Sequence, residues 1–154
     1  MSSEPSSAER QTHYRAVLGD ATRAGVYHLP PGNRDDIVAA AEACAYQVFR
    51  VDLARARDKE SLLAAVGRDM AFPEWFGVNW DALADSLGDL GWRPAEGYLI
   101  ILEHCDRING RAHDDLVAAL HLFSAAADEW RERGVAFWCL VDMHADGIAW
   151  LPAL

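Results

Sequence analysis

The sequence is poor in cysteine and has no long apolar run. Its three cysteines, Cys44, Cys105 and Cys139, form no closely spaced pair, so we expect buried, reduced thiols rather than a disulfide framework or a zinc site. No apolar run approaches the roughly 18 residues of a membrane span, and the first residues lack the basic and apolar parts of a secretory signal. These absences predict a soluble cytoplasmic protein that does not bind membranes.

Positive charge is also scarce. Acidic residues number 24 against 14 basic residues, which gives a formal net charge of -10. Such a balance makes contact with phosphate backbones unfavourable and contact with a basic protein favourable. No glycine-rich loop of the phosphate-binding type is present either. We therefore expect no binding to nucleic acid.

The pattern of apolar residues predicts strands that alternate with helices. Strands are expected at 26–29, 47–53, 98–102 and 135–141, and helices at 35–45, 59–69, 80–88 and 112–133. This alternation favours an α/β fold in which a small parallel β-sheet is packed with helices. Residues 1–24 are predicted to be a flexible N-terminal segment, in which 8–18 could form a short helix. Residues 25–154 are predicted to form a single domain.

Aspartates recur at four-residue steps in and just after the predicted helix 80–88, at Asp81, Asp85 and Asp89. On one helix face, such like charges repel by about 0.2–0.5 kcal/mol per pair, while apolar residues such as Leu83 mark the opposite face as the buried one. The helix dipole favours Asp81 but disfavours Asp89 at the carboxyl end. A face that opposes its own helix indicates a surface for a cationic partner, although a merely solvated acidic face is the alternative.

Two other groups of residues could carry chemistry. His104 and Cys105 follow the predicted strand 98–102, as a nucleophile and its base might be arranged in a hydrolase, but neighbouring residues do not by themselves provide the required geometry. His113 and His121 lie two helical turns apart, which is too far for them to bind one metal ion. We expect neither catalysis nor metal binding at these positions.

The run 72–87, FPEWFGVNWDALADSL, carries a specific motif. It resembles, without gaps, the signature of the barstar family, the intracellular inhibitors of barnase-type ribonucleases, whose pattern is roughly LPEYYGxNxDALxDxL. The similarity extends over about residues 47–141. It implies a barstar-like fold with three core strands, to which the predicted strand 26–29 adds an extra N-terminal strand.

The resemblance also implies a set of partner-binding residues. Asp85 holds the place of the aspartate that enters the ribonuclease active site and mimics the substrate phosphate, and Asp81 matches a second acidic contact. The other implied contacts are Trp75, Gly77, Asn79, Trp92 and Glu129, and Asp89 extends the acidic stripe. Ala84 stands where family members often carry a contacting tryptophan, which leaves the identity of the target open.

The resulting hypothesis is a non-enzymatic inhibitor that blocks the cationic active site of a basic extracellular-type ribonuclease or a similar cationic toxin, as a toxin-immunity protein does. No metal or cofactor is implied. Two alternatives remain open: a fold-related interaction or regulatory module for another basic protein, and a hydrolase that uses paired carboxylates such as Asp81 and Asp85. The hydrolase requires a pocket that raises the pKa of one carboxyl group.

Overall fold

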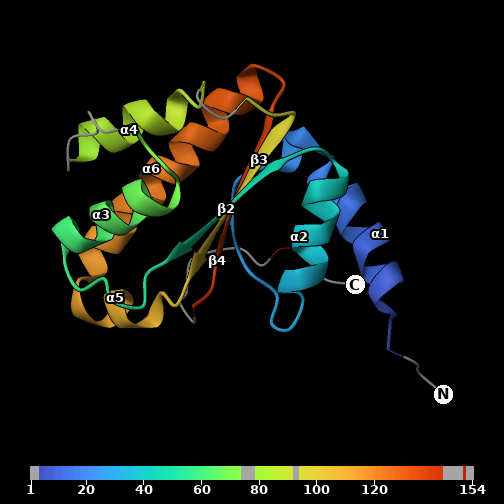
Figure 1. Ribbon diagram of the computed structural model, residues 1–154, viewed down its shortest axis with the longest axis horizontal. Coiled ribbons are helices and arrows are strands. Elements are labelled where there is room, and N and C mark those ends of the chain that lie inside the picture. Colours follow the sequence, from blue (N-terminus) through green and yellow to red (C-terminus); the bar gives the residue numbers. More distant parts are fainter. Residues whose placement is uncertain (1–3, 74–78, 92–93, 144–150, 152–154) are drawn as a thin grey trace.

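In the computed structural model, which describes residues 4–73, 79–91, 94–143 and 151, helices cover both faces of a parallel β-sheet (Figure 1). The elements in chain order are α1 (Ser7–Leu18), the 3-10 turn η1 (Ala21–Arg23), β1 (Val26–His28), α2 (Arg34–Ala43), β2 (Gln47–Asp52), α3 (Lys59–Asp69), α4 (Trp80–Gly88), β3 (Gly97–Glu103), α5 (Asp106–Arg111), α6 (His113–Glu132) and β4 (Ala136–Val141). The predicted alternation of strands and helices is confirmed.

The sheet has four strands in the order β1-β4-β3-β2, and every neighbouring pair is parallel. The two central strands, β3 and β4, are buried along their whole length, as their continuous apolar runs predict for strands covered on both faces. β1 pairs with the outer edge of β4, with Val26 opposite Cys139. The predicted three core strands and extra N-terminal strand are therefore confirmed.

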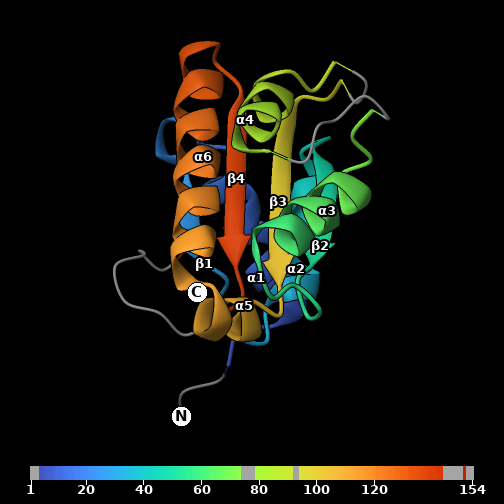
Figure 2. The ribbon, with the colours of Figure 1, turned by 90° about the vertical axis from the view of Figure 1, so that its left-hand side faces the viewer.

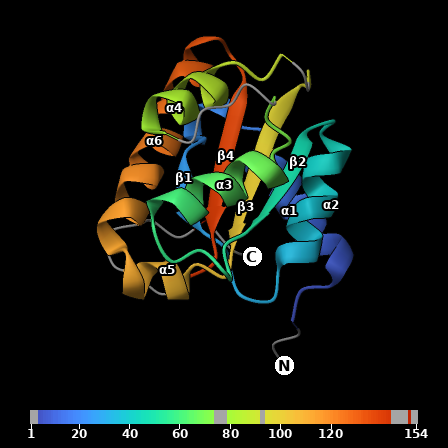
Figure 3. The same ribbon diagram turned by 60° about the vertical axis from the view of Figure 1, so that its left-hand side comes forward.

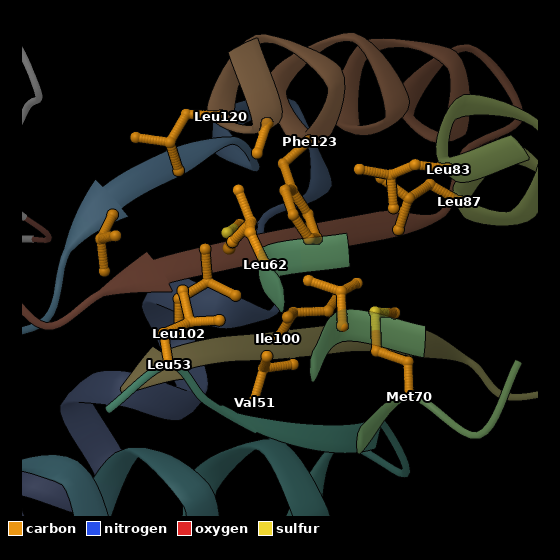
Figure 4. Close-up of a cluster of buried hydrophobic side chains, with 14 of the residues drawn as sticks. Val51, Leu53, Leu62, Met70, Leu83, Leu87, Ile100, Leu102, Leu120 and Phe123 are labelled. Carbon is orange, nitrogen blue, oxygen red and sulfur yellow. The ribbon is translucent and has the colours of Figure 1, made fainter. Parts of the chain in front are cut away.

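Two apolar cores lie on opposite faces of the sheet. The first is formed with α3 to α6, and Figure 4 shows Leu62, Leu83, Ile100 and Phe123 among its side chains. The second is formed with α1 and α2, which cover the other face (Figure 2). The second core contains Tyr14, Leu18, Ile37, Leu99, Ile101, Trp138 and Leu140. Because residues on a strand alternate between the faces, Leu99 and Ile100 belong to different cores.

The N-terminal residues differ from the predicted flexible segment, because residues 7–18 form α1. Ser6 caps this helix by accepting a hydrogen bond from the Glu9 amide. Tyr14 and Leu18 are completely buried. The Trp138 indole donates to the Leu18 carbonyl at 3.0 Å, which joins the end of α1 to β4. The residues before Gly25 thus contribute to the second core.

A polar cluster also joins α1 to α2. Asp36 on α2 is buried, and its carboxylate accepts hydrogen bonds from Arg10 Nε at 2.6 Å, from Ser7 and from Gln11. These hydrogen bonds, above all that from Arg10, lower the pKa of Asp36 from 3.8 to about 2. The cluster is thus built around the charged form of the carboxyl group.

This cluster predicts an acid-sensitive contribution to stability. Because the pKa of Asp36 is lower in the folded chain, the contribution is present above the unfolded value of 3.8 and is lost as the pH falls toward about 2. Asp36→Asn is expected to lower stability at neutral pH and to flatten this part of the profile, measured as the urea midpoint at each pH. Asp35→Asn, at an exposed neighbouring position, is the matched control. Parallel profiles for Asp36→Asn and the parent would contradict this role.

The remaining sequence predictions concern membranes and thiols. Within the described ranges, no helix has both the length and the apolar character needed to cross a bilayer. All three cysteines are free thiols, with Cys105 and Cys139 buried and Cys44 half-buried at the end of α2.

Candidate functional site

The acidic helix α4 has one buried and one exposed face, as its sequence predicts. Asn79 caps its start, because the side-chain oxygen accepts a hydrogen bond from the Ala82 amide at 2.7 Å. Leu83 packs in the first core with none of its surface exposed. Asp81 and Asp85 are exposed. The core therefore fixes which side of α4 faces solvent.

Asp89 lies just beyond the helix, which ends at Gly88. Its backbone is extended, with φ -128° and ψ 96°, and its amide donates to the Asp85 carbonyl at 3.1 Å. One oxygen of its carboxylate accepts a hydrogen bond from the Gly91 amide at 3.1 Å. Asp89 therefore lies outside the helix on which it was expected to extend the acidic face, and its carboxylate takes part in a local turn.

Glu129 joins this region from a distant part of the chain. It is exposed on α6, which lies beside α4 (Figure 3). A Cβ atom added at Gly88 would lie only 3.2 Å from Glu129 Oε2, so the carboxylate of Glu129 sits against the carboxyl end of α4. We call Asp81, Asp85, Asp89 and Glu129 together the acidic surface.

The acidic surface carries four carboxylates. Within the part of the chain that the structure describes, none of its four carboxylates forms an ion pair. Carboxylates elsewhere do: Asp36 pairs with Arg10, Glu103 with Arg50 and Asp69 with Arg68. The difference indicates that this charge is available to a cationic partner.

Two cations near α4 are engaged with other groups. The Lys59 ammonium lies over the Trp80 ring, 5.6 Å from its centroid, beside the start of the helix. Arg133 donates a hydrogen bond to the Gly88 carbonyl at 3.0 Å, at the end of the helix. These contacts place each cation on a ring or a carbonyl and leave the exposed aspartates of α4 unpaired.

The predicted site includes four further residues around the start and end of α4 in the sequence. Trp75, Gly77 and Trp92 lie outside the described residues. Asn79 is exposed, but its side-chain oxygen is used by the helix cap. Helix capping is therefore sufficient reason for an asparagine at this position. A contact of Asn79 with a partner remains a prediction.

The candidate nucleophile Cys105 does not have the environment of a reactive cysteine. The side chain is completely buried, and burial raises the pKa of its thiol to about 12, whereas a nucleophilic cysteine needs a lowered pKa. His104 instead contacts Asp52, with 3.0 Å between Nδ1 and Oδ1. The thiol therefore lacks the lowered pKa that this candidate site requires.

Four described carboxyl groups have clearly shifted pKa values. Those with shifted pKa values among the described residues are all shifted downward by hydrogen bonds, opposite to the direction that a general acid requires: Asp36, Asp52, Asp58 and Asp69. Across the described ranges there is also no group of three or more side chains suited to a metal ion.

One cavity lies at the other end of the sheet. It has a volume of about 440 Å³ and is lined by residues after β1 and β4, including Pro31, Arg34 and Asp142. Parallel α/β proteins usually bind small ligands at this carboxyl edge of the sheet. The acidic helix α4 lies instead toward the amino ends of β3 and β4 (Figure 2). The exposed aspartates of α4 thus lie away from this cavity.

The fold and the acidic surface together define a parallel α/β protein that presents to solvent an acidic helix whose aspartates form no ion pair with the described residues. The family model "Barstar (barnase inhibitor)" matches residues 46–142, and the chain belongs to the barstar family. The matched range contains β2, β3 and β4 as well as the acidic surface. The resemblance inferred from the run 72–87 is confirmed, and α1, β1 and α2 lie outside the matched range.

Two further comparisons do not identify a function. No curated protein matches the sequence. Among solved structures, the chain is similar to the ORC2 protein of Aeropyrum pernix in its ADP form, with a TM-score of 0.54 and 15% sequence identity. The match covers 90% of this chain and 41% of that chain. At this identity, the likeness shows the fold alone.

Proposed function

We propose that this protein is an inhibitor that blocks the cationic active site of a basic extracellular-type ribonuclease, or of a similar cationic toxin. The acidic surface and the loop before α4 are the parts that bind. The observation that carries the proposal is that Asp81 and Asp85 are exposed, with no ion-pair partner among the described residues, on a helix whose other face is anchored in the core. Membership of the barstar family supports it.

The chemistry of RNA cleavage explains why such a surface would inhibit. An enzyme that binds RNA presents arginine, lysine or histidine to the phosphates, and these groups bind carboxylates by charge-assisted hydrogen bonds. Carboxylates fixed on a packed helix satisfy the same cations but offer no phosphodiester bond to cleave. The inhibitor thus occupies the enzyme as a substrate mimic, and it needs no metal or cofactor to do so.

The proposal gives each residue a position in the interface. Asp85 lies in the middle of α4 and takes the place of the substrate phosphate, while Asp81, Asp89 and Glu129 flank it. Asn79, Trp75, Gly77 and Trp92 are proposed as further contacts on the basis of the family resemblance. We also propose that the protein acts in the cytoplasm, where it would protect the RNA of its own cell.

The direct test is an RNA-cleavage assay with a purified basic microbial ribonuclease and increasing amounts of this protein. A loss of cleavage that saturates at one inhibitor per enzyme supports the proposal. Binding without loss of cleavage would favour the interaction-module alternative instead. An intrinsic hydrolytic activity that disappears in Asp85→Asn would favour the hydrolase.

The association rate is expected to depend on salt. Steering by complementary charge raises association rate constants to about 10⁸–10⁹ M⁻¹s⁻¹ at low salt, against about 10⁵–10⁶ M⁻¹s⁻¹ without it. Exposed charges are screened beyond about 8–10 Å near physiological ionic strength. Stopped-flow measurements over a salt series should therefore show a steep fall in the association rate and a smaller change in the dissociation rate. An association rate that stays flat would remove electrostatic steering from the mechanism.

A further inference from the structure

The carboxyl end of α4 leaves two backbone carbonyls that the helix cannot satisfy itself. The Asp89 amide donates to the Asp85 and Ser86 carbonyls, so the last two carbonyls, of Leu87 and Gly88, lie beyond the helical hydrogen bonds. Gly88 does not provide the left-handed glycine that often ends a helix, because the cap residue Asp89 is extended. The end of α4 therefore needs donors from elsewhere.

Trp130 on α6 and Arg133, the residue after its end, supply these donors through their side chains. Trp130 Nε1 donates to the Leu87 carbonyl at 2.8 Å, and Arg133 Nη1 donates to the Gly88 carbonyl at 3.0 Å. The two side chains also contact each other, because the Arg133 guanidinium lies over the Trp130 ring, 4.4 Å from its centroid. The indole also packs against Tyr98 on β3, with 5.2 Å between ring centroids. The donors are thus tied to the central sheet.

The same two contacts fix where the carboxylates lie. Glu129 precedes Trp130 on α6 and approaches Gly88, while Asp85 and Asp89 are joined through the last turn of α4. The helix has only 9 residues, and isolated helices of that length are marginal in water. The cation of Arg133 is also favourable at a helix carboxyl end. Any loss of the α6 contacts should therefore loosen this end of α4.

We propose that Trp130 and Arg133 are positioning residues that hold α4 against α6, and thereby preorganise Asp85, Asp89 and Glu129 for binding. The role in binding rests on the proposed function, whereas the role in holding α4 against α6 does not. A surface that is already ordered loses less conformational entropy on binding. If the competent arrangement is populated only in part, the apparent affinity falls by that fraction.

The sign of the charge makes Arg133→Gln an informative variant. It removes a cation from a protein of net charge -10, so electrostatics alone would strengthen attraction to a basic partner. The proposal expects the opposite, a weaker complex. Arg131→Gln is the matched control, because Arg131 lies on the same helix but donates to the Ala24 carbonyl at 2.6 Å, away from α4. Trp130→Phe removes the indole donor and keeps an aromatic ring.

The first measurement needs no partner. Amide hydrogen exchange should be at least about tenfold faster in α4 for Arg133→Gln and Trp130→Phe, with the exchange of β3 and β4 unchanged, as for local opening. Arg131→Gln should leave exchange in α4 at the parental rate. Arg133→Lys, which keeps a donor and the charge, should restore part of the protection. If α4 exchanges at the parental rate in both Arg133→Gln and Trp130→Phe, these residues do not hold α4 in place, whatever the protein binds.

The second measurement is calorimetric titration with a basic microbial ribonuclease that the parent inhibits. Arg133→Gln and Trp130→Phe should both bind about tenfold more weakly than the parent. Arg131→Gln should bind at least as tightly as the parent. Faster exchange with unchanged affinity would overturn the positioning role. If no basic ribonuclease is bound even by the parent, the proposed function fails, and hydrogen exchange alone then decides whether α6 holds α4 in place.

Discussion

Replacing Asp85 with alanine is expected to weaken partner binding by about 2–5 kcal/mol, which corresponds to about 30-fold to several thousand-fold in Kd. Asp85 is exposed in the middle of α4, so it should lie at the centre of the interface and be the most fully desolvated carboxylate. Removing it leaves the cations opposite buried and unpaired. Alanine at Asp81 or Glu129 is expected to cost less, because charges at the rim stay solvated, and alanine at Trp75 is also expected to cost less than alanine at Asp85.

The measurement is an alanine series assayed by inhibition of a basic ribonuclease and by calorimetry. Glu42→Ala is the charge-matched control, since Glu42 is exposed on α2 on the opposite side of the sheet. It should leave the affinity close to that of the parent. If Asp85→Ala and Asp81→Ala both bind as tightly as the parent, the interface lies elsewhere on the molecule.

Signals confined to a few neighbouring residues predicted the structure well. Asp58 precedes the helix expected at 59–69 and forms a reciprocal capping box with Ser61. Asn79 caps the helix expected at 80–88. Gly134 follows the helix expected at 112–133 and has a left-handed backbone, with φ 77°. Each of these depends on local backbone geometry, which the residue type itself restricts.

Local signals were weaker where short elements depend on tertiary contacts. Asn33 stands before α2 and is a residue type that often caps helices, but its side chain makes no capping bond and donates to the Pro31 carbonyl instead. The helix α5 was not predicted, because it has only 6 residues and a single buried side chain, Ile108. The mostly polar α1 is ordered through Tyr14, Leu18 and the Asp36 cluster, which pair residues far apart in sequence.

Some residues of the candidate site could be predicted from the sequence, and some of its contacts could not. The motif at 72–87 located Asp81 and Asp85, and the family resemblance implied Glu129. The contacts of Trp130 and Arg133 with α4 join residues 43 and 45 positions apart. No pattern in the sequence indicates which carbonyl an indole will meet at that separation. The absence of ion pairs on the acidic surface, within the described residues, likewise emerges only once the helices are packed.

The core and surface faces of α4 are expected to respond to mutation in opposite ways. Leu83→Ala should lower the free energy of unfolding by about 2–5 kcal/mol, because Leu83 is completely buried in the first core (Figure 4). Asp85→Ala should leave stability unchanged or slightly raised, since it removes like-charge repulsion on the helix. Urea unfolding at neutral pH measures both changes.

The comparison separates a structural role for the acidic face from a binding role. Leu83 and Asp85 lie on the same short helix, so any general sensitivity of α4 to alanine would appear in both variants. A destabilised Leu83→Ala beside a stable Asp85→Ala that no longer inhibits assigns the carboxylate to partner binding. If Asp85→Ala unfolds the protein, its carboxylate is part of what holds the fold together, and the assignment of Asp85 to the interface fails.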